Sequence, residues 1–91
     1  MNMHPIKIMI ADDHTLVTEM WSALLDQDER LKIVATTTNG EDTLVKVQQV
    51  RPDILLLDIE LPDMSGIDVV KMVRKYSPGT RVIGVSLHTQ P

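Results

Sequence analysis

Short apolar runs rich in β-branched residues alternate with stretches of helical periodicity, and this alternation constrains the fold more than any other feature of the chain. The apolar runs cover residues 6–11, 31–37, 53–57 and 81–87, and the helical stretches cover residues 15–27, 41–50 and 65–76. Strands that alternate with helices are joined by right-handed crossovers, which build a parallel sheet covered by helices. The sequence therefore predicts an α/β domain of order βαβαβαβ.

Each helical stretch carries apolar residues on one face, which we expect to pack on the sheet. These residues are Leu16, Met20, Ala23 and Leu24 in the first stretch, Leu44, Val47 and Val50 in the second, and Val69, Val70 and Val73 in the third. The strands read as continuous apolar runs, such as ILLL at 54–57 and VIGV at 82–85. Continuous runs are typical of strands that are buried on both faces.

The composition limits the chemistry that the chain can perform. The 91 residues include no cysteine, which excludes disulfides, thiolate metal sites and cysteine nucleophiles. The net charge is -4 without a basic cluster, so we expect no direct contact of this segment with nucleic acid. No apolar run approaches the roughly 18 residues of a membrane span, and residues 1–7 lack the apolar core of a signal peptide. We therefore expect a cytoplasmic protein without membrane contact.

Polar side chains follow three of the four predicted strands. Asp12 and Asp13 follow the first strand, Asp58 ends the third, and Ser86 ends the fourth. Ligands of open α/β sheets bind at the carboxyl ends of the strands, so neighbouring first and third strands would bring three carboxylates into one crevice. Two carboxylates ~5 Å apart repel by about 3 kcal/mol at an effective dielectric constant near 20. We therefore expect a cation between them.

The nature of the ligands indicates which cation this is. A set of oxygen ligands without cysteine suits a hard octahedral ion, Mg²⁺ first and Mn²⁺ second. A divalent ion in an acidic crevice is also what phosphoryl transfer requires, because it neutralises charge on the transferring oxygens. An ionised aspartate beside the metal can attack phosphorus and become an aspartyl phosphate.

Three motifs in this order resemble the receiver domain of two-component response regulators: IADDH at 10–14, DILLLDIELPDMSG at 53–66 and VIGVSLH at 82–88. ADDH followed by Leu16-Val17 is similar to the LuxR-type (NarL-like) subfamily. The similarity runs over the whole chain. It implies a flavodoxin-like (CheY-like) doubly wound parallel sheet, with residues 1–91 forming a receiver domain that lacks the last helix, strand and helix.

The resemblance also implies a role for each site residue. Asp58 would be the phosphorylated residue and a metal ligand, Asp13 a direct Mg²⁺ ligand, Asp12 a ligand through water, the backbone carbonyl of Glu60 a further ligand, and Ser86 the hydroxyl that bonds the phosphoryl oxygens. The phosphoryl donor would be a phosphohistidine of a sensor histidine kinase. The chain would then be no enzyme beyond assisting its own phosphorylation, and it would switch a downstream output domain, expected to bind DNA.

In the family that the motifs resemble, a fourth helix, a fifth strand with an active-site lysine and a fifth helix follow the fourth strand. We therefore expect these 91 residues to be part of a longer regulator. With the family's strand order 2-1-3-4-5, the fourth strand becomes an edge, and its VIGVSL sequence has no charge or proline to block pairing. We expect a homodimer or strand-exchanged oligomer that buries this edge against a second chain.

Other interpretations of the same residues remain. The acidic pair could simply cap the first helix, and the chain could be a pseudo-receiver that dimerises without phosphorylation. A phosphatase of the haloacid-dehalogenase type needs a second aspartate two residues after the nucleophile, where Glu60 stands. A flavodoxin would place a phosphate where Asp12 and Asp13 repel it. His14 and His88 are expected to cap a helix or lie in solvent rather than to bind a metal.

Overall fold

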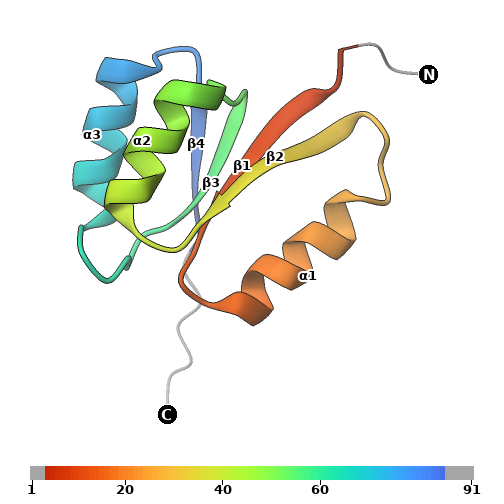
Figure 1. The fold of residues 1–91 in the computed structure, drawn as a ribbon, viewed down its shortest axis with the longest axis horizontal. Helices are drawn as coiled ribbons and strands as arrows, with labels where there is room; N and C mark the ends of the chain where they lie inside the picture. The colour runs from red at the N-terminus through yellow and green to blue at the C-terminus, as the bar shows by residue number, and fades with distance from the viewer. Residues whose placement is uncertain (1–3, 86–91) are drawn as a thin grey trace.

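The computed structural model describes residues 4–85, and within this range four strands and three helices follow one another in the predicted order. The strands are β1 (Ile6–Ala11), β2 (Leu31–Thr37), β3 (Ile54–Asp58) and β4 (Arg81–Val85). The helices are α1 (Thr15–Leu25), α2 (Gly40–Val50) and α3 (Gly66–Tyr76). The strands form one parallel sheet of order β2-β1-β3-β4, which confirms the predicted fold (Figure 1).

Helices cover both faces of the sheet, and each face has its own hydrophobic cluster (Figure 1). The cluster between the sheet and the α2–α3 layer consists of Met9, Ala11, Val47, Leu55, Leu57, Leu61, Val69 and Val73. The cluster on the α1 side consists of Ile8, Ile10 and Leu56, with Trp21 and Leu25 packed against it. Successive side chains of a strand point to opposite faces, so β1 and β3 supply both clusters and are buried on both sides.

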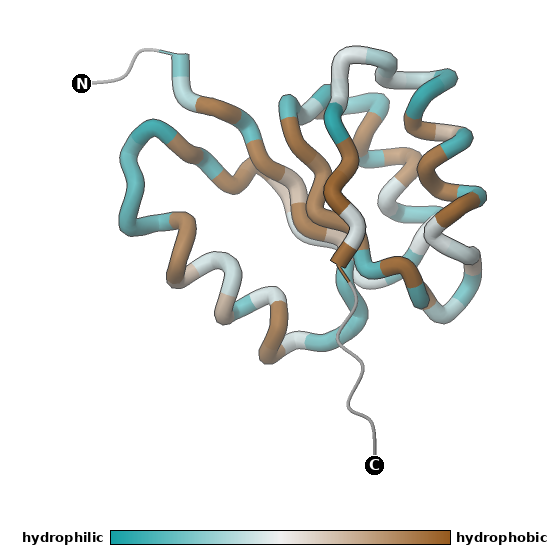
Figure 2. The backbone as a smooth tube through the Cα atoms, turned by 180° about the vertical axis from the view of Figure 1, so that it is seen from behind, coloured by the Kyte–Doolittle hydropathy of each residue, from teal (hydrophilic) through white to brown (hydrophobic). Residues whose placement is uncertain are grey.

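The outer strand β4 is less buried than its apolar sequence predicts. Ile83, in the middle of β4, is 49% exposed, whereas Leu56, its partner on β3, is 8% exposed. The difference follows from the position of β4 at the edge of the sheet. Helix α1 packs against the cluster formed by β1 and β3, so it does not cover Ile83. Figure 2 shows the hydrophobic residues gathered along the strands between the helices.

The predicted packing faces of α2 and α3 are confirmed, but that of α1 is wrong. Val47 of α2 and Val73 of α3 are fully buried in the larger cluster. On α1, however, the predicted face is turned to solvent, and the exposed fractions are 80% for Leu16, 46% for Met20 and 53% for Leu24. Ala23, predicted on the same face, is also exposed. The helix packs instead through Trp21 and Leu25, an apolar pair at i, i+4 that lies next to the predicted stripe.

The ends of the elements lie within two residues of the predicted bounds. The Asn39 side chain accepts a hydrogen bond from the amide of Asp42 at the start of α2, and the Ser65 side chain accepts one from Asp68 at the start of α3. β3 runs one residue later than predicted and ends on Asp58, while α1 ends two residues early, at Leu25. The last two residues of the predicted fourth strand lie outside the described residues. Within residues 4–85, no helix is long and apolar enough to cross a membrane.

The loop between β3 and α3 closes tightly on itself at Gly66. The amide of Gly66 donates to the carbonyl of Ile59 over 2.9 Å, and a Cβ added at Gly66 would lie 2.7 Å from the Ile59 Cα. Backbone cannot move aside as a flexible side chain can. Glycine is therefore required here by the close approach of two backbone segments.

Replacing Gly66 by alanine should lower the free energy of unfolding by about 1–3 kcal/mol, because the added methyl group forces the loop away from α3. Urea denaturation measures this directly. Gly79→Ala is the matched control, since a Cβ there meets nothing within 4 Å and should change stability by less than about 0.5 kcal/mol. Equal effects at both positions would contradict the described loop.

The orientation of α1 can be tested with two neighbouring leucines. Leu25→Ala should destabilise the protein by about 1–3 kcal/mol, because Leu25 packs on the α1-side cluster. Leu24→Ala should cost less than about 0.5 kcal/mol, because Leu24 is exposed. The comparison uses the same denaturation measurement, and a larger loss for Leu24→Ala would restore the orientation predicted from the sequence.

Candidate metal centre

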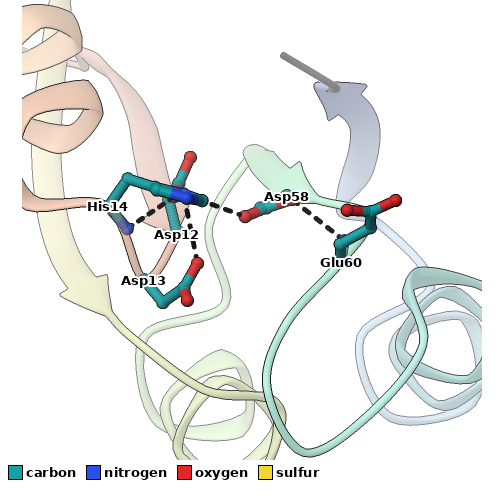
Figure 3. A network of polar contacts seen from close by, with 5 residues as sticks. All are labelled: Asp12, Asp13, His14, Asp58 and Glu60. Carbon is teal, nitrogen blue, oxygen red and sulfur yellow. Dashed lines mark hydrogen bonds and ion pairs between the residues drawn. The ribbon is translucent and has the colours of Figure 1, made fainter. Parts of the chain in front are cut away.

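Strand order places acidic side chains side by side at the carboxyl edge of the sheet. β1 and β3 are neighbours, and Ala11, the last residue of β1, is in register with Leu57. The next residue of each chain segment is an aspartate, Asp12 after β1 and Asp58 at the end of β3. Figure 3 shows the two approaching each other from the adjacent strands, with Asp13 beside them.

Four side chains gather within metal-binding range at this edge. Asp12, Asp13, His14 and Asp58 each offer one ligand atom, and these atoms all lie within 4.8 Å of one another. Asp12 and Asp58 are buried, with exposed fractions of 6% and 8%, whereas Asp13 and His14 are open to solvent. The arrangement leaves one side of the cluster accessible to a ligand from outside.

His14 occupies a place in this cluster that the sequence did not predict. It is the N-cap residue of α1, as expected, but its side chain makes no cap hydrogen bond. Its ring Nδ1 lies 2.8 Å from Asp12 Oδ1, 3.2 Å from Asp13 Oδ1 and 3.5 Å from Asp58 Oδ2 (Figure 3). The hydrogen bond to Asp12, and next the charge of Asp13, raise the pKa of His14 above its usual 6.5. When protonated, the ring compensates part of the negative charge.

The two oxygens of Asp58 differ in their surroundings. Oδ1 accepts a hydrogen bond from the amide of Glu60 over 2.9 Å. Oδ2 is buried and has no hydrogen-bond partner among residues 4–85, because the His14 contact at 3.5 Å is too long to be a good one. A buried carboxylate oxygen without a partner costs free energy, which a cation at that position would recover.

The donor set fits a divalent ion of the Mg²⁺ type. It consists of carboxylate oxygens from Asp12, Asp13 and Asp58. One of these oxygens, Asp58 Oδ2, is buried and has no hydrogen-bond partner among the described residues. Oxygen ligands around an open, partly hydrated position are what Mg²⁺ and Mn²⁺ prefer. The ring of His14 is 66% exposed and can leave the cluster without unpacking the core.

The roles predicted for the remaining site residues, Glu60 and Ser86, stay predictions. Glu60 follows Asp58 closely, and its amide holds the Asp58 side chain, but the role of its carbonyl stays a prediction. Ser86 lies outside the described residues, as does His88. The sequence also did not predict the position of Asp63, whose carboxylate accepts hydrogen bonds from the amides of Gly40 and Glu41 at the start of α2. These two hydrogen bonds lower the pKa of Asp63.

Comparison with known proteins places this geometry in a family. A family model described as the response regulator receiver domain matches residues 8–91. A protein-glutamate methylesterase/protein-glutamine glutaminase 2 of Koribacter versatilis is 34% identical over 85 residues, which are 93% of this chain and 23% of that protein. The transcriptional regulatory protein LnrK of Bacillus subtilis is 36% identical over 78 residues, which are 86% of this chain and 36% of that protein. The chain thus spans well under half the length of these relatives.

Solved structures agree with the sequence comparison. The signal receiver domain of the response regulator NarL from Mycobacterium tuberculosis has a TM-score of 0.87 and 31% identity, covering 97% of this chain and 71% of that chain. The response regulator domain of Thermotoga maritima CheB has a TM-score of 0.86 and 29% identity, covering 91% of this chain and 61% of that chain. Relatives of the CheB and LuxR kinds both match, so no single subfamily is shown. The family model and the shared fold together show that this chain belongs to the response regulator receiver domain family.

Proposed function

We propose that this chain is the phosphoacceptor module of a two-component system, in which Asp58 receives a phosphoryl group from a sensor histidine kinase. The observation that carries the proposal is the Asp58 carboxylate itself. Its Oδ2 is buried and without a hydrogen-bond partner among the described residues, and it faces an acidic crevice with an open side. Such an oxygen has the position and the free lone pairs that a nucleophile needs.

The residues around Asp58 suit a magnesium-dependent transfer. Asp13 and Asp58 would bind Mg²⁺ directly, Asp12 through water, and Glu60 through its backbone carbonyl, and Mn²⁺ would fit the same ligands. When bound, the ion neutralises charge on the phosphoryl oxygens. Asp12 is buried beside Asp58, so it keeps the crevice negative and attractive to a divalent cation.

The chain's own groups orient the reacting carboxylate. The Glu60 amide holds Oδ1, and this fixes the side chain so that Oδ2 points into the crevice. Oδ2 would attack phosphorus in line, a new O–P bond would form, and the N–P bond of the phosphohistidine would break with its electron pair returning to the imidazole ring. The Ser86 hydroxyl would then donate a hydrogen bond to a phosphoryl oxygen.

We place the chain in a longer, cytoplasmic regulator of the LuxR type with a DNA-binding output domain. Support comes from the 31% identity to the NarL receiver domain and the 36% identity to LnrK. A CheB-type parent is the competing assignment, because a methylesterase is 34% identical. The reading frame that encodes the chain distinguishes them: a helix-turn-helix downstream supports the first, and a methylesterase domain contradicts it.

Incubation with a small phosphoryl donor such as acetyl phosphate and Mg²⁺ should add one phosphoryl group to Asp58. Intact mass spectrometry detects it, and the modification should be labile to base, as an acyl phosphate is. Asp58→Ala should reduce it to background, while Asp68→Asn, an exposed aspartate on α3, should leave it unchanged. A wild-type chain that remains unmodified favours the phosphorylation-independent pseudo-receiver. Modification that persists in Asp58→Ala would contradict the assignment of Asp58 as the acceptor.

We also propose that two chains associate through β4. This strand is the edge of the sheet next to β3, and among the described residues it carries no proline and only Arg81 as a charge. An exposed edge of this kind offers unpaired backbone groups to another strand. Exposed Ile83 would be covered in the same contact.

Sedimentation equilibrium at micromolar concentration should therefore show a dimer. Ile83→Lys should shift the protein to a monomer, because a lysine at an edge blocks strand addition. Val45→Lys is the control, since Val45 is 51% exposed on α2, a helix that packs against β1 and β2, and it should leave the dimer intact. A well-folded wild-type monomer would refute the proposed association.

A further inference from the structure

The carboxylate of Asp63 connects the loop after β3 to the first turn of α2. Oδ1 accepts a hydrogen bond from the Gly40 amide over 2.6 Å, and Oδ2 accepts one from the Glu41 amide over 3.0 Å. The amide of Asp42 is already bonded to the Asn39 side chain. The first amides of a helix lack partners within the helix, and they carry partial positive charge. Asp63 thus supplies, from a distant loop, the part of the helix cap that Asn39 does not.

The loop that holds Asp63 is the one that leaves the phosphoacceptor. It comprises residues 59–65, begins directly after Asp58 and contains Glu60. Its base is closed by the Gly66 amide, which bonds the Ile59 carbonyl, and by a bridge between Glu60 and Ser65. These contacts all lie near its two ends, so they leave the tip of the loop to be fixed by something outside it.

Packing reinforces the hydrogen bonds at the tip. Met64 lies against the start of α2 so closely that a Cβ added at Gly40 would be 2.7 Å from the Met64 Sδ. Gly40 itself is buried. Asp63 and Met64 therefore hold the loop tip on the end of α2 by two adjacent side chains, one polar and one apolar.

We propose that Asp63 is a positioning residue for the metal centre, which holds the loop where the Glu60 carbonyl reaches the ion and couples metal binding to the start of α2. This inference rests on the proposed function, because it assumes that Asp58 and the Glu60 carbonyl bind the metal. An ordinary helix cap would affect only stability. A positioning residue must also change the affinity for the ion.

Coupling between two sites is reciprocal. If the contact of Asp63 with α2 favours the loop conformation that binds metal, then bound metal strengthens that contact by the same factor. The amides of Gly40 and Glu41, which donate to Asp63, should therefore exchange more slowly with solvent when Mg²⁺ is present. This effect is measured on the unmodified protein.

The test compares Mg²⁺ dissociation constants by calorimetry in three variants. Asp63→Ala should weaken binding about tenfold, at the low end of the range seen when outer partners of metal ligands are removed. Asp63→Asn keeps one acceptor oxygen and should recover part of the loss. Asp42→Asn is the matched control. It removes one negative charge at the same helix end, where the Asp42 carboxylate accepts a hydrogen bond from the Asn39 side chain, and it should leave the constant within about twofold.

Each outcome decides between the possibilities. If Asp63→Ala binds Mg²⁺ with wild-type affinity but is less stable, Asp63 is an ordinary helix cap and the inference is overturned. The proposed function would still be upheld in that case if Asp58→Asn loses Mg²⁺ binding. A wild-type protein that binds no Mg²⁺ overturns both. If Asp63→Ala does not fold, amide exchange of Gly40 and Glu41 in the wild type decides, and rates unaffected by Mg²⁺ would reject the coupling.

Discussion

The pairing of β1 with β3 is the constraint on which the site depends, because it sets Asp12 and Asp58 at the ends of neighbouring strands. Two buried carboxylates so close together repel each other. The described structure offsets it in part through the ring of His14, which lies above all three aspartates. One buried oxygen of Asp58 still lacks a hydrogen-bond partner there, and it marks where a cation adds most to stability.

The strands that carry this charge are also the most firmly packed part of the molecule. β1 and β3 lie in the middle of the sheet and supply side chains to the clusters on both faces, so their carboxyl ends are held in place. The adjoining loop is held as well, by the Glu60 amide at its start and by Asp63 at its tip. A rigid base and a tethered loop allow a small ion to be bound with a defined set of ligands.

Much of the fold could be predicted from the sequence because its signals are local. The strands, the helix caps at Asn39 and Ser65, and the packing faces of α2 and α3 each follow from residues within one or two turns. The face of α1 could not be predicted, because two adjacent apolar stripes, one with Leu24 and one with Leu25, satisfy the same periodicity. The three aspartates of the site were identified from their places at strand ends, whereas the ring position of His14 and the contact of Asp63 with α2 depend on residues brought together only by the fold.

The most direct test of the central claim is a crystal of the protein soaked in Mn²⁺, with anomalous scattering used to locate the ion. We expect one strong peak in the crevice between β1 and β3, at an ion bonded to oxygens of Asp13 and Asp58, with the ring of His14 displaced from the three aspartates. An empty crevice at high Mn²⁺ concentration, with the His14 ring still in place, would contradict it.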